Sequence, residues 1–239
     1  MSVPAAMLQV EGINTYRGPA QILRGVSLRV GAAEAVCLVG RNGAGKTTTI
    51  DSIMGLLSVR GGTITFKGED VTRLPAHRRA RMGIGYAPED TGIFPDLTVA
   101  ENFQVSEWLS RAETSAAAAE ERTFGIFPEV KTFLGRRGLH LSGGQKKMVA
   151  IARAMTLSPS ILLLDEPLEG LAPLVVTRFI DAVKRIKALG ISILIAESSV
   201  VNATRVADRL YAIDRGEIIY AGDPRTVFDN EEVMKTIRG

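Results

Sequence analysis

The sequence is short of cysteine, of long apolar runs and of charge of one sign. Its single cysteine, Cys37, lies in the apolar run AVCLVG, so we expect a small core residue, no disulfide and a reducing compartment. No run of 18 apolar residues occurs, and the start MSVPAAMLQV lacks a basic stretch followed by a long apolar one. We therefore expect a chain that neither crosses a membrane nor is secreted.

Charge is nearly balanced, with 29 Lys and Arg against 26 Asp and Glu, which gives a net charge of +3. So small and dispersed an excess gives no argument for a nucleic-acid partner. The densest basic stretch, HRRARM at 77–82, predicts a solvated helix face. With 239 residues, 46% of them hydrophobic, the chain can bury a sizeable core, and it contains neither an internal repeat nor a long linker.

The order of the apolar segments predicts an α/β fold. Alternating patterns at 8–16 and 26–30 are typical of half-exposed antiparallel strands. Continuous apolar strands separated by helical patterns follow, which is the βαβ rhythm of a parallel sheet; the strands are expected at 35–40, 161–166 and 191–197. The chain from about 98 to 157 has a helical pattern throughout, and strands at 210–214 and 217–222 flank Arg215-Gly216 as a hairpin.

A phosphate-binding loop is predicted at 40–47, where GRNGAGKT fits G-x-x-x-x-G-K-[ST] between a strand and a helix. Its backbone N–H groups would cradle phosphates, Lys46 would reach the β and γ phosphates, and Thr47 would ligate Mg²⁺. An accidental match in such a chain is on the order of one in a hundred. We expect ATP to bind the residues Gly40, Arg41, Asn42, Gly43, Ala44, Gly45, Lys46, Thr47 and Thr48.

The run ILLLDE at 161–166 supplies the second element of an NTPase. Asp165, at the end of a buried strand, can hold Mg²⁺, while Glu166 faces an attacking water. Many core strands end in an acid, so this motif is weak alone. The motif is a stronger indication of an NTPase when combined with the phosphate-binding loop, because Asp165 follows Lys46 by about 119 residues on a parallel strand.

A second glycine-rich helix start occurs in LSGGQKKMVAIARAM at 141–155. Ser142 and the two glycines after it would present N–H groups and a hydroxyl suited to a phosphate. One chain with one Lys46 does not need two phosphate sites, unless the second serves the nucleotide of a partner chain.

GRNGAGKTT, LSGGQ and ILLLDEP, in this order, resemble the ATP-binding subunit of ABC transporters over essentially the whole chain. The resemblance implies one ABC ATPase domain: a P-loop core with a parallel sheet and an N-terminal antiparallel β part, about 1–97 and 158–239, and a helical subdomain, about 98–157. It also implies that two subunits sandwich two ATP molecules head to tail. The capping residues would be Ser142, Gly143, Gly144 and Gln145 of one subunit, acting on the γ-phosphate held by the other's Lys46.

By the same resemblance Glu166 is the general base and Tyr16 stacks on adenine, although on sequence grounds Tyr16 could equally be a surface aromatic. The stretches 86–103, 165–173 and 229–239 resemble the smaller ATPase subunit of branched-chain amino-acid importers. That branch carries glutamate where most ABC ATPases have the lid glutamine, which places Glu89 near Mg²⁺ and water. Residues from Glu89 to about 108 would form the groove for a short helix of the membrane subunit, and Phe103 is more simply a packing residue.

The implied protein energises import of branched-chain or other apolar amino acids. Its partners would be transmembrane permease subunits, a second ABC ATPase subunit, with a heterodimer favoured over a homodimer, and indirectly a solute-binding protein. It would lie peripherally on the cytoplasmic face of the inner membrane. The solute and the transport direction rest on the resemblance alone.

Two positions depart from the family pattern. Ser198 stands where most ABC ATPases have the switch histidine, and a serine would need a bridging water to contact the γ-phosphate. Leu168 stands where many relatives have a serine that contacts the opposite nucleotide site, so the sequence leaves open how strongly the two nucleotide sites are coupled. We expect Glu166 to carry most of the catalysis and Ser198 to tune it.

Three other interpretations are open. A soluble ABC ATPase of repair or translation uses the same motifs, but this chain has one cassette, no long coiled-coil insertion and no strong basic patch. A nucleotide-binding partner with little turnover would explain Ser198 and Leu168, but it needs neither Glu166 nor LSGGQ. A P-loop kinase or GTPase shares the fold and does not explain LSGGQ.

Overall fold

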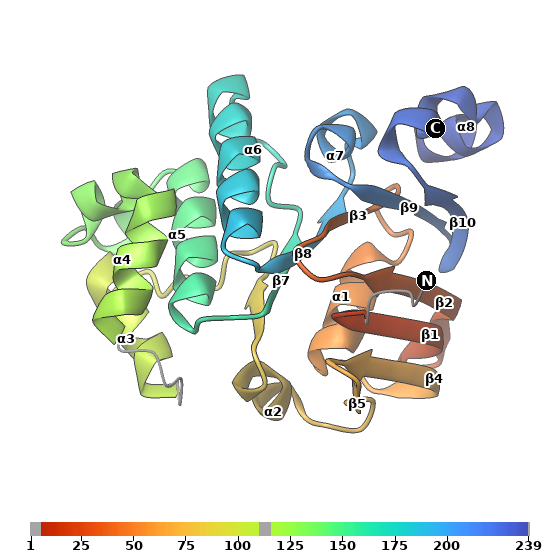
Figure 1. Ribbon diagram of the computed structural model, residues 1–239, viewed down its shortest axis with the longest axis horizontal. Helices are drawn as coiled ribbons and strands as arrows, with labels where there is room; N and C mark the ends of the chain where they lie inside the picture. The colour runs from red at the N-terminus through yellow and green to blue at the C-terminus, as the bar shows by residue number, and fades with distance from the viewer. Residues whose placement is uncertain (1–5, 110–115, 239) are drawn as a thin grey trace.

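The computed structural model describes residues 6–109 and 116–238. Two sheets, with helices packed against them, make up this part of the chain (Figure 1). One sheet is six-stranded and largely parallel, and the other is four-stranded and antiparallel. The α/β fold predicted from the alternating apolar segments is confirmed.

The six-stranded sheet has the order β10-β9-β3-β8-β7-β6. Its strands are β3 Ala35–Val39, β6 Ile84–Ala87, β7 Ile161–Asp165, β8 Ser192–Glu197, β9 Arg209–Asp214 and β10 Glu217–Gly222. All neighbours pair in parallel except β9 and β10, which form the predicted hairpin around Arg215-Gly216. Every residue of β3, β7 and β8 is buried, as expected for strands covered on both faces.

The antiparallel sheet has the order β2-β1-β4-β5. Its strands are β1 Leu8–Arg17, β2 Ala20–Val30, β4 Val59–Phe66 and β5 Glu69–Asp70. The prediction of a strand at 26–30 is too short, since β2 begins six residues earlier. Register shifts against β1 and a positive φ of 68° at Gly25 interrupt the alternation from which the strand was predicted, although pairing continues to Ala20.

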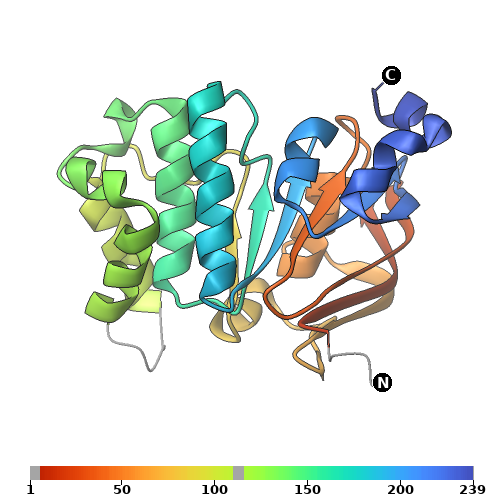
Figure 2. The same cartoon turned by 45° about the horizontal axis from the view of Figure 1, so that its top comes forward.

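The helices are α1 Lys46–Met54, α2 Ala76–Arg81, α3 Val99–Leu109, α4 Ala116–Ile126, α5 Gly143–Thr156, α6 Pro173–Ala188, α7 Val200–Val206 and α8 Glu231–Arg238, with 3₁₀ turns η1 Pro128–Phe133, η2 Gly138–His140 and η3 Pro224–Asp229. Figures 1 and 2 show α3, α4 and α5 grouped at the end of the molecule away from the antiparallel sheet. The predicted bounds of a helical subdomain, 98–157, stay a prediction.

The prediction of helix throughout 98–157 is wrong for its middle. Between α4 and α5 the described chain forms η1, η2, turns and an isolated bridge from Arg137 to Thr98. Gly138 cannot be replaced by a larger residue here, because a Cβ would lie 2.6 Å from the Phe94 carbonyl oxygen. The backbone of this stretch instead pairs with the start of α3, where the Val99 N–H donates to the Arg136 carbonyl at 2.9 Å.

The six-stranded sheet separates two apolar cores. Alternate residues of β3 face opposite sides, so that Cys37 packs with the helices α5 to α8 while Leu38 packs with α1 and the antiparallel sheet. Cys37 is fully buried, which confirms a core residue, and Phe103 of α3 is fully buried in the helical core as a packing residue. Within the described ranges, no helix is both long and apolar enough to span a membrane.

The interpretation of 77–82 as a solvated helix face is wrong for Arg79. Its side chain is only 2% exposed, and its guanidinium donates to the carbonyl oxygens of Ser52, at 2.9 Å, and Ile53, at 2.7 Å. These carbonyls belong to the last turn of α1, where only the Ser52 carbonyl accepts a further hydrogen bond from the described backbone, donated by the Gly55 N–H at 3.2 Å. Arg79 therefore caps the helix that follows the phosphate-binding loop.

Candidate nucleotide site

Three loops meet at the carboxyl edge of the parallel sheet. The register places Val39 beside Glu197 and Asp165 beside Ala196. The loops that follow β3, β7 and β8 consequently start side by side, and the Gly40 N–H donates to the Glu197 carbonyl at 3.3 Å. Ligands of open α/β sheets bind at this edge. The strand ILIAES therefore ends in polar residues because it ends at the candidate site.

The loop 40–45 leads from β3 into α1 with a geometry that requires glycine at two positions. A Cβ at Gly40 would lie 2.4 Å from the Ile213 carbonyl oxygen, and Gly45, the N-cap of α1, has φ 117°. No side chain caps α1. Its first N–H groups therefore remain available to an anion, which is the arrangement that the motif predicts.

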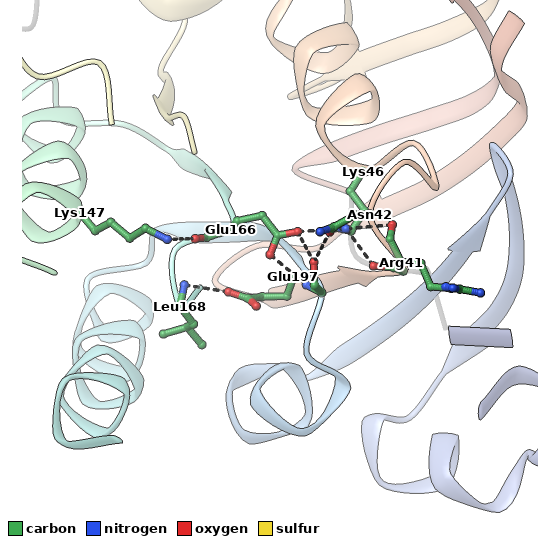
Figure 3. A network of polar contacts seen from close by, with 9 residues as sticks. Arg41, Asn42, Lys46, Lys147, Glu166, Leu168 and Glu197 are labelled. Carbon is green, nitrogen blue, oxygen red and sulfur yellow. Dashed lines mark hydrogen bonds and ion pairs between the residues drawn. The ribbon is translucent and has the colours of Figure 1, made fainter. Parts of the chain in front are cut away.

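Lys46 is buried at the first position of α1, with 5% of its surface exposed. Its ammonium donates to the Gly40 carbonyl at 2.8 Å and to the Arg41 carbonyl at 3.2 Å. The same Nζ lies 3.0 Å from Oε1 of Glu166 (Figure 3). The ion pair between two nearly fully buried side chains links the loop after β3 to the loop after β7, so the structure brings these predicted residues together.

Glu166 has a left-handed backbone with φ 47°, which is uncommon for a residue with a side chain. Its N–H donates to the Ala196 carbonyl at 2.9 Å, while its side chain faces Lys46 and the loop after β8. Such a conformation persists only where the surroundings hold it, and it clusters at functional sites. The carboxylate is thereby directed into the site.

Ser198 contacts Glu166 through both its backbone and its side chain. Its N–H donates to Oε2 at 3.0 Å, and its hydroxyl lies 2.6 Å from Oε1 and 3.0 Å from Oδ1 of Asn42. The single hydroxyl hydrogen serves one of these acceptors at a time, and the contact to Glu166 is the shorter. Ser198 therefore orients the carboxylate in this structure.

Both carboxylate oxygens of Asp165 are buried, and neither has a hydrogen-bond partner among the described residues. Burial raises the pKa of Asp165 to about 6, and the charges of Glu166 and Glu89 raise it as well, while the nearby Thr47 hydroxyl lowers it. A buried carboxylate without a partner is costly and fits a cation. Within the described ranges no cluster of three metal-ligating side chains occurs.

A cavity of about 530 Å³ opens beside the loop. The predicted residues that line it are Asn42, Gly43, Gly45, Lys46, Thr47, Thr48, Glu89 and Glu166. Arg17, Ile22 and Glu169 also line it and were not predicted, because no motif includes them. Tyr16 does not line the cavity, and the Arg60 guanidinium lies 4.3 Å from its ring centroid, so adenine stacking on Tyr16 stays a prediction.

The LSGGQ segment lies apart from this cavity, since none of the residues 142–145 lines it. Ser142 is the N-cap of α5 in a capping box: its Oγ accepts from the Gln145 N–H at 3.3 Å, and Gln145 Oε1 accepts from the Ser142 N–H at 3.0 Å. Ser142 and Gly143 are exposed. The chain thus does not complete its own nucleotide site with this segment.

Two charged side chains that the sequence did not single out hold the backbone after Glu166. The Lys147 ammonium donates to the carbonyls of Glu166 and Glu169, and Oε1 of Glu197 accepts from the Leu168 N–H (Figure 3). Burial raises the pKa of Glu197 to about 7, while the Leu168 amide and the Lys147 charge lower it. No sequence spacing links Lys147 to residue 166, because the contact depends on how α5 packs beside β7.

The sequence matches the family model for ABC transporters over residues 23–169. The chain belongs to the ABC transporter family. It is 36% identical over 220 residues to the lipopolysaccharide export system ATP-binding protein LptB of Acidithiobacillus ferridurans, which covers 91% of this chain and 90% of that protein. It is 31% identical over 233 residues to the high-affinity branched-chain amino acid transport ATP-binding protein BraG of Pseudomonas aeruginosa, with 98% of this chain and 100% of that protein covered.

Solved structures of the family share the fold. The crystal structure of the ADP conformation of an ATP-binding cassette of an ABC transporter superimposes with a TM-score of 0.84 and 28% identity, over 98% of this chain and 99% of that one. The resemblance drawn from GRNGAGKTT, LSGGQ and ILLLDEP is therefore confirmed, and so is the ABC ATPase fold. This ABC ATPase hydrolyses ATP to power a transporter.

Proposed function

We propose that this ABC ATPase energises the import of branched-chain or other apolar amino acids or similar small solutes. The similarity to BraG supports the proposal, because it extends over 98% of this chain and the whole of that protein. Glu89, at the position of the lid glutamine, and the end of the chain carry the same resemblance. A second candidate, energising export of a lipopolysaccharide or related lipid, is supported by the 36% identity to LptB.

The observation that carries the site assignment is the carboxylate of Glu166, 3.0 Å from the Lys46 ammonium at the P-loop cavity. Phosphate oxygens of ATP would draw Lys46 away from Glu166 and leave its carboxylate free to accept a proton from the attacking water. Ser198 keeps the carboxylate in place through its N–H and hydroxyl. Glu166 is the general base in this mechanism, and Ser198 tunes it.

Asp165, Thr47 and Glu89 would hold Mg²⁺ near the phosphates. When bound, the ion supplies positive charge that offsets the charge of the transferring phosphoryl group. The unpartnered oxygens of Asp165 fit this role, and the Thr47 hydroxyl lies at the cavity. Asp165 would hold the ion in its ionised form, which becomes the major form above a pH of about 6.

The exposed Ser142 and Gly143, with Gly144 and Gln145, would cap the γ-phosphate held by a second ATPase subunit, and a heterodimer is the favoured arrangement. Transmembrane permease subunits would dock on the groove between Glu89 and about residue 108, which includes most of α3. A solute-binding protein would contact the assembly only through the permease. The ATPase would lie on the cytoplasmic face of the inner membrane.

Phosphate release by the purified chain with Mg²⁺ and ATP, measured over a range of protein concentrations, tests the catalytic part. We expect turnover that rises more than in proportion to concentration and that is lost in Glu166→Gln, while ATP binding is retained. Turnover that persists in Glu166→Gln contradicts the assignment of the base. If the chain alone binds ATP without turnover, adding a second ABC ATPase subunit should restore it.

Uptake of labelled leucine, isoleucine and valine tests the transported class. In cells lacking the chain, we expect uptake to fall and to recover with the wild-type chain but not with Glu166→Gln. Unchanged uptake together with glycolipid retained at the inner membrane would instead favour the export candidate. The two assays separate the candidates because loss of ATP hydrolysis in Glu166→Gln should impair only the transport process that this ATPase energises.

A further inference from the structure

The segment 166–171, directly after β7, is held by charged side chains from two other elements. From α5, the Lys147 Nζ lies 2.5 Å from the Glu166 carbonyl oxygen and 2.8 Å from that of Glu169. From the end of β8, Glu197 accepts from the Leu168 N–H at 2.8 Å. Figure 3 shows Lys147 reaching Glu166 from the side opposite Lys46. Three backbone groups of the segment, at residues 166, 168 and 169, thus depend on two side chains.

The Glu166 peptide needs this support. Its φ of 47° is a conformation that costs on the order of 1 kcal/mol for a residue with a Cβ. The Ala196 carbonyl holds the N–H of Glu166, and the shortest contact to its own carbonyl is the Lys147 ammonium. Because the two peptide planes around Glu166 fix the direction of its Cα–Cβ bond, Lys147 helps to set where the carboxylate lies.

Lys147 belongs to the helix that starts with the LSGGQ segment. It lies one turn after Gly143 on α5, whose capping box joins Ser142 to Gln145. A regular helix of this length moves as one body, so a displacement of its N-terminus moves Lys147 with it. The same side chain contacts the backbone of the base that serves the other nucleotide site. Lys147 therefore connects the two half-sites of one chain.

We propose that Lys147 is a positioning residue that couples phosphate capping at Ser142 to the placement of Glu166. The proposal rests on the function proposed for these two residues. Capping of the partner's nucleotide shifts α5, and Lys147 transmits this shift to the carbonyls of residues 166 and 169. Leu168, which is 2% exposed and apolar, offers no polar side chain for such a link, so the link is made through the backbone and Lys147.

The test compares Lys147→Met with Lys147→Arg, and with Lys146→Met as a matched control on the same helix. Met is similar in length but lacks the donor, whereas Arg keeps it. We expect Lys147→Met to lower kcat about tenfold or more with little change in KM for ATP, and to reduce the Hill coefficient for ATP. Lys147→Arg should recover most of kcat, and Lys146→Met should change kcat less than twofold.

Amide hydrogen exchange supplies a readout independent of turnover. In Lys147→Met the amides of residues 168–171 should exchange faster than in the wild type, and in Lys146→Met they should not. The proposal is overturned if Lys147→Met keeps the wild-type kcat and Hill coefficient, or if the arginine variant is as impaired as the methionine variant. Glu166→Gln is included in the same assay. If this variant retains turnover, Glu166 is not the general base. If Glu166→Gln loses turnover while Lys147→Met keeps it, only the positioning role of Lys147 is refuted.

Discussion

The two glycine-rich helix starts of this chain, at α1 and at α5, differ in how their N-termini are satisfied. No side chain caps α1, and its first residue, Lys46, is buried in contact with Glu166. The start of α5 is complete by itself, because Ser142 and Gln145 satisfy each other's backbone, and it is exposed. The N-terminus of α1 is therefore part of a site within this chain. The N-terminus of α5 is capped by its own residues and can contact a ligand that is bound by another subunit.

The largest expected effect comes from altering the second start alone. Ser142→Asp keeps a good N-cap, so α5 should fold normally, but it places a negative charge where a phosphate would be capped. Because like charges brought together cost several kcal/mol, we expect turnover to fall by more than about 100-fold. Fluorescent-nucleotide titration should show ATP binding to the single chain unchanged within about twofold. A matching loss of binding would mean that the two starts share one site.

A substitution at the N-terminus of α1 should instead lower the affinity of the single chain for ATP. Lys46→Ala removes a charged donor from the cavity, and hydrogen bonds to charged groups are worth about 1.5–3 kcal/mol. We therefore expect ATP affinity of the single chain to fall about 10- to 100-fold in the same titration. Lys184→Ala, which removes an exposed lysine of α6 outside the cavity lining, is the matched control. Unchanged affinity in Lys46→Ala would contradict the role of this lysine.

A smaller effect is expected at Ser198, which holds the base next to the first start. Ser198→Ala loses the hydroxyl contact but keeps the backbone N–H that donates to Glu166. Hydrogen bonds to charged groups contribute about 1.5–3 kcal/mol, and the backbone N–H still orients the Glu166 carboxylate, so we expect kcat to fall about 10-fold, at the lower end of this range. Steady-state phosphate release beside Glu166→Gln measures this. If Ser198→Ala abolished hydrolysis as fully as Glu166→Gln, the ranking of the two residues would be abandoned.

A separate prediction concerns the pH dependence of stability and the segment 166–171, whose Leu168 N–H donates to Glu197. Burial raises the pKa of Glu197 from 4.5 to about 7, so between these values the folded state binds a proton that the unfolded state does not. The free energy of unfolding should therefore fall as pH rises through this window. Glu197→Gln should remove this part of the slope while Asp165 contributes equally to both proteins. Thermal unfolding between pH 4.5 and 7.5 is the measurement, and parallel curves for the two proteins would refute the assignment.

Residues that act within a few positions of one another were predictable. The glycines at 40 and 45, the start of α5 at Ser142 and the hairpin at Arg215-Gly216 follow from local backbone geometry. Arg79 was misjudged because a run of basic residues gives no sign of which side chain meets the end of α1. Tyr16 was assigned by resemblance, and the cavity instead includes its neighbour Arg17.

By itself, the sequence determined the buried strands of the parallel sheet, the phosphate-binding loop and the acidic pair at 165 and 166, because apolar patterns and short local motifs specify them. Only the tertiary structure decided that Ser198 orients Glu166, that Lys147 supports the backbone after it and that Asp165 is left without a partner. The contacts of Lys147 and Ser198 with Glu166 join residues 19 and 32 positions apart, and the Asp165 carboxylate has no hydrogen-bond partner among the described residues. They depend on the register of β7 against β8 and on the packing of α5, which no local pattern encodes.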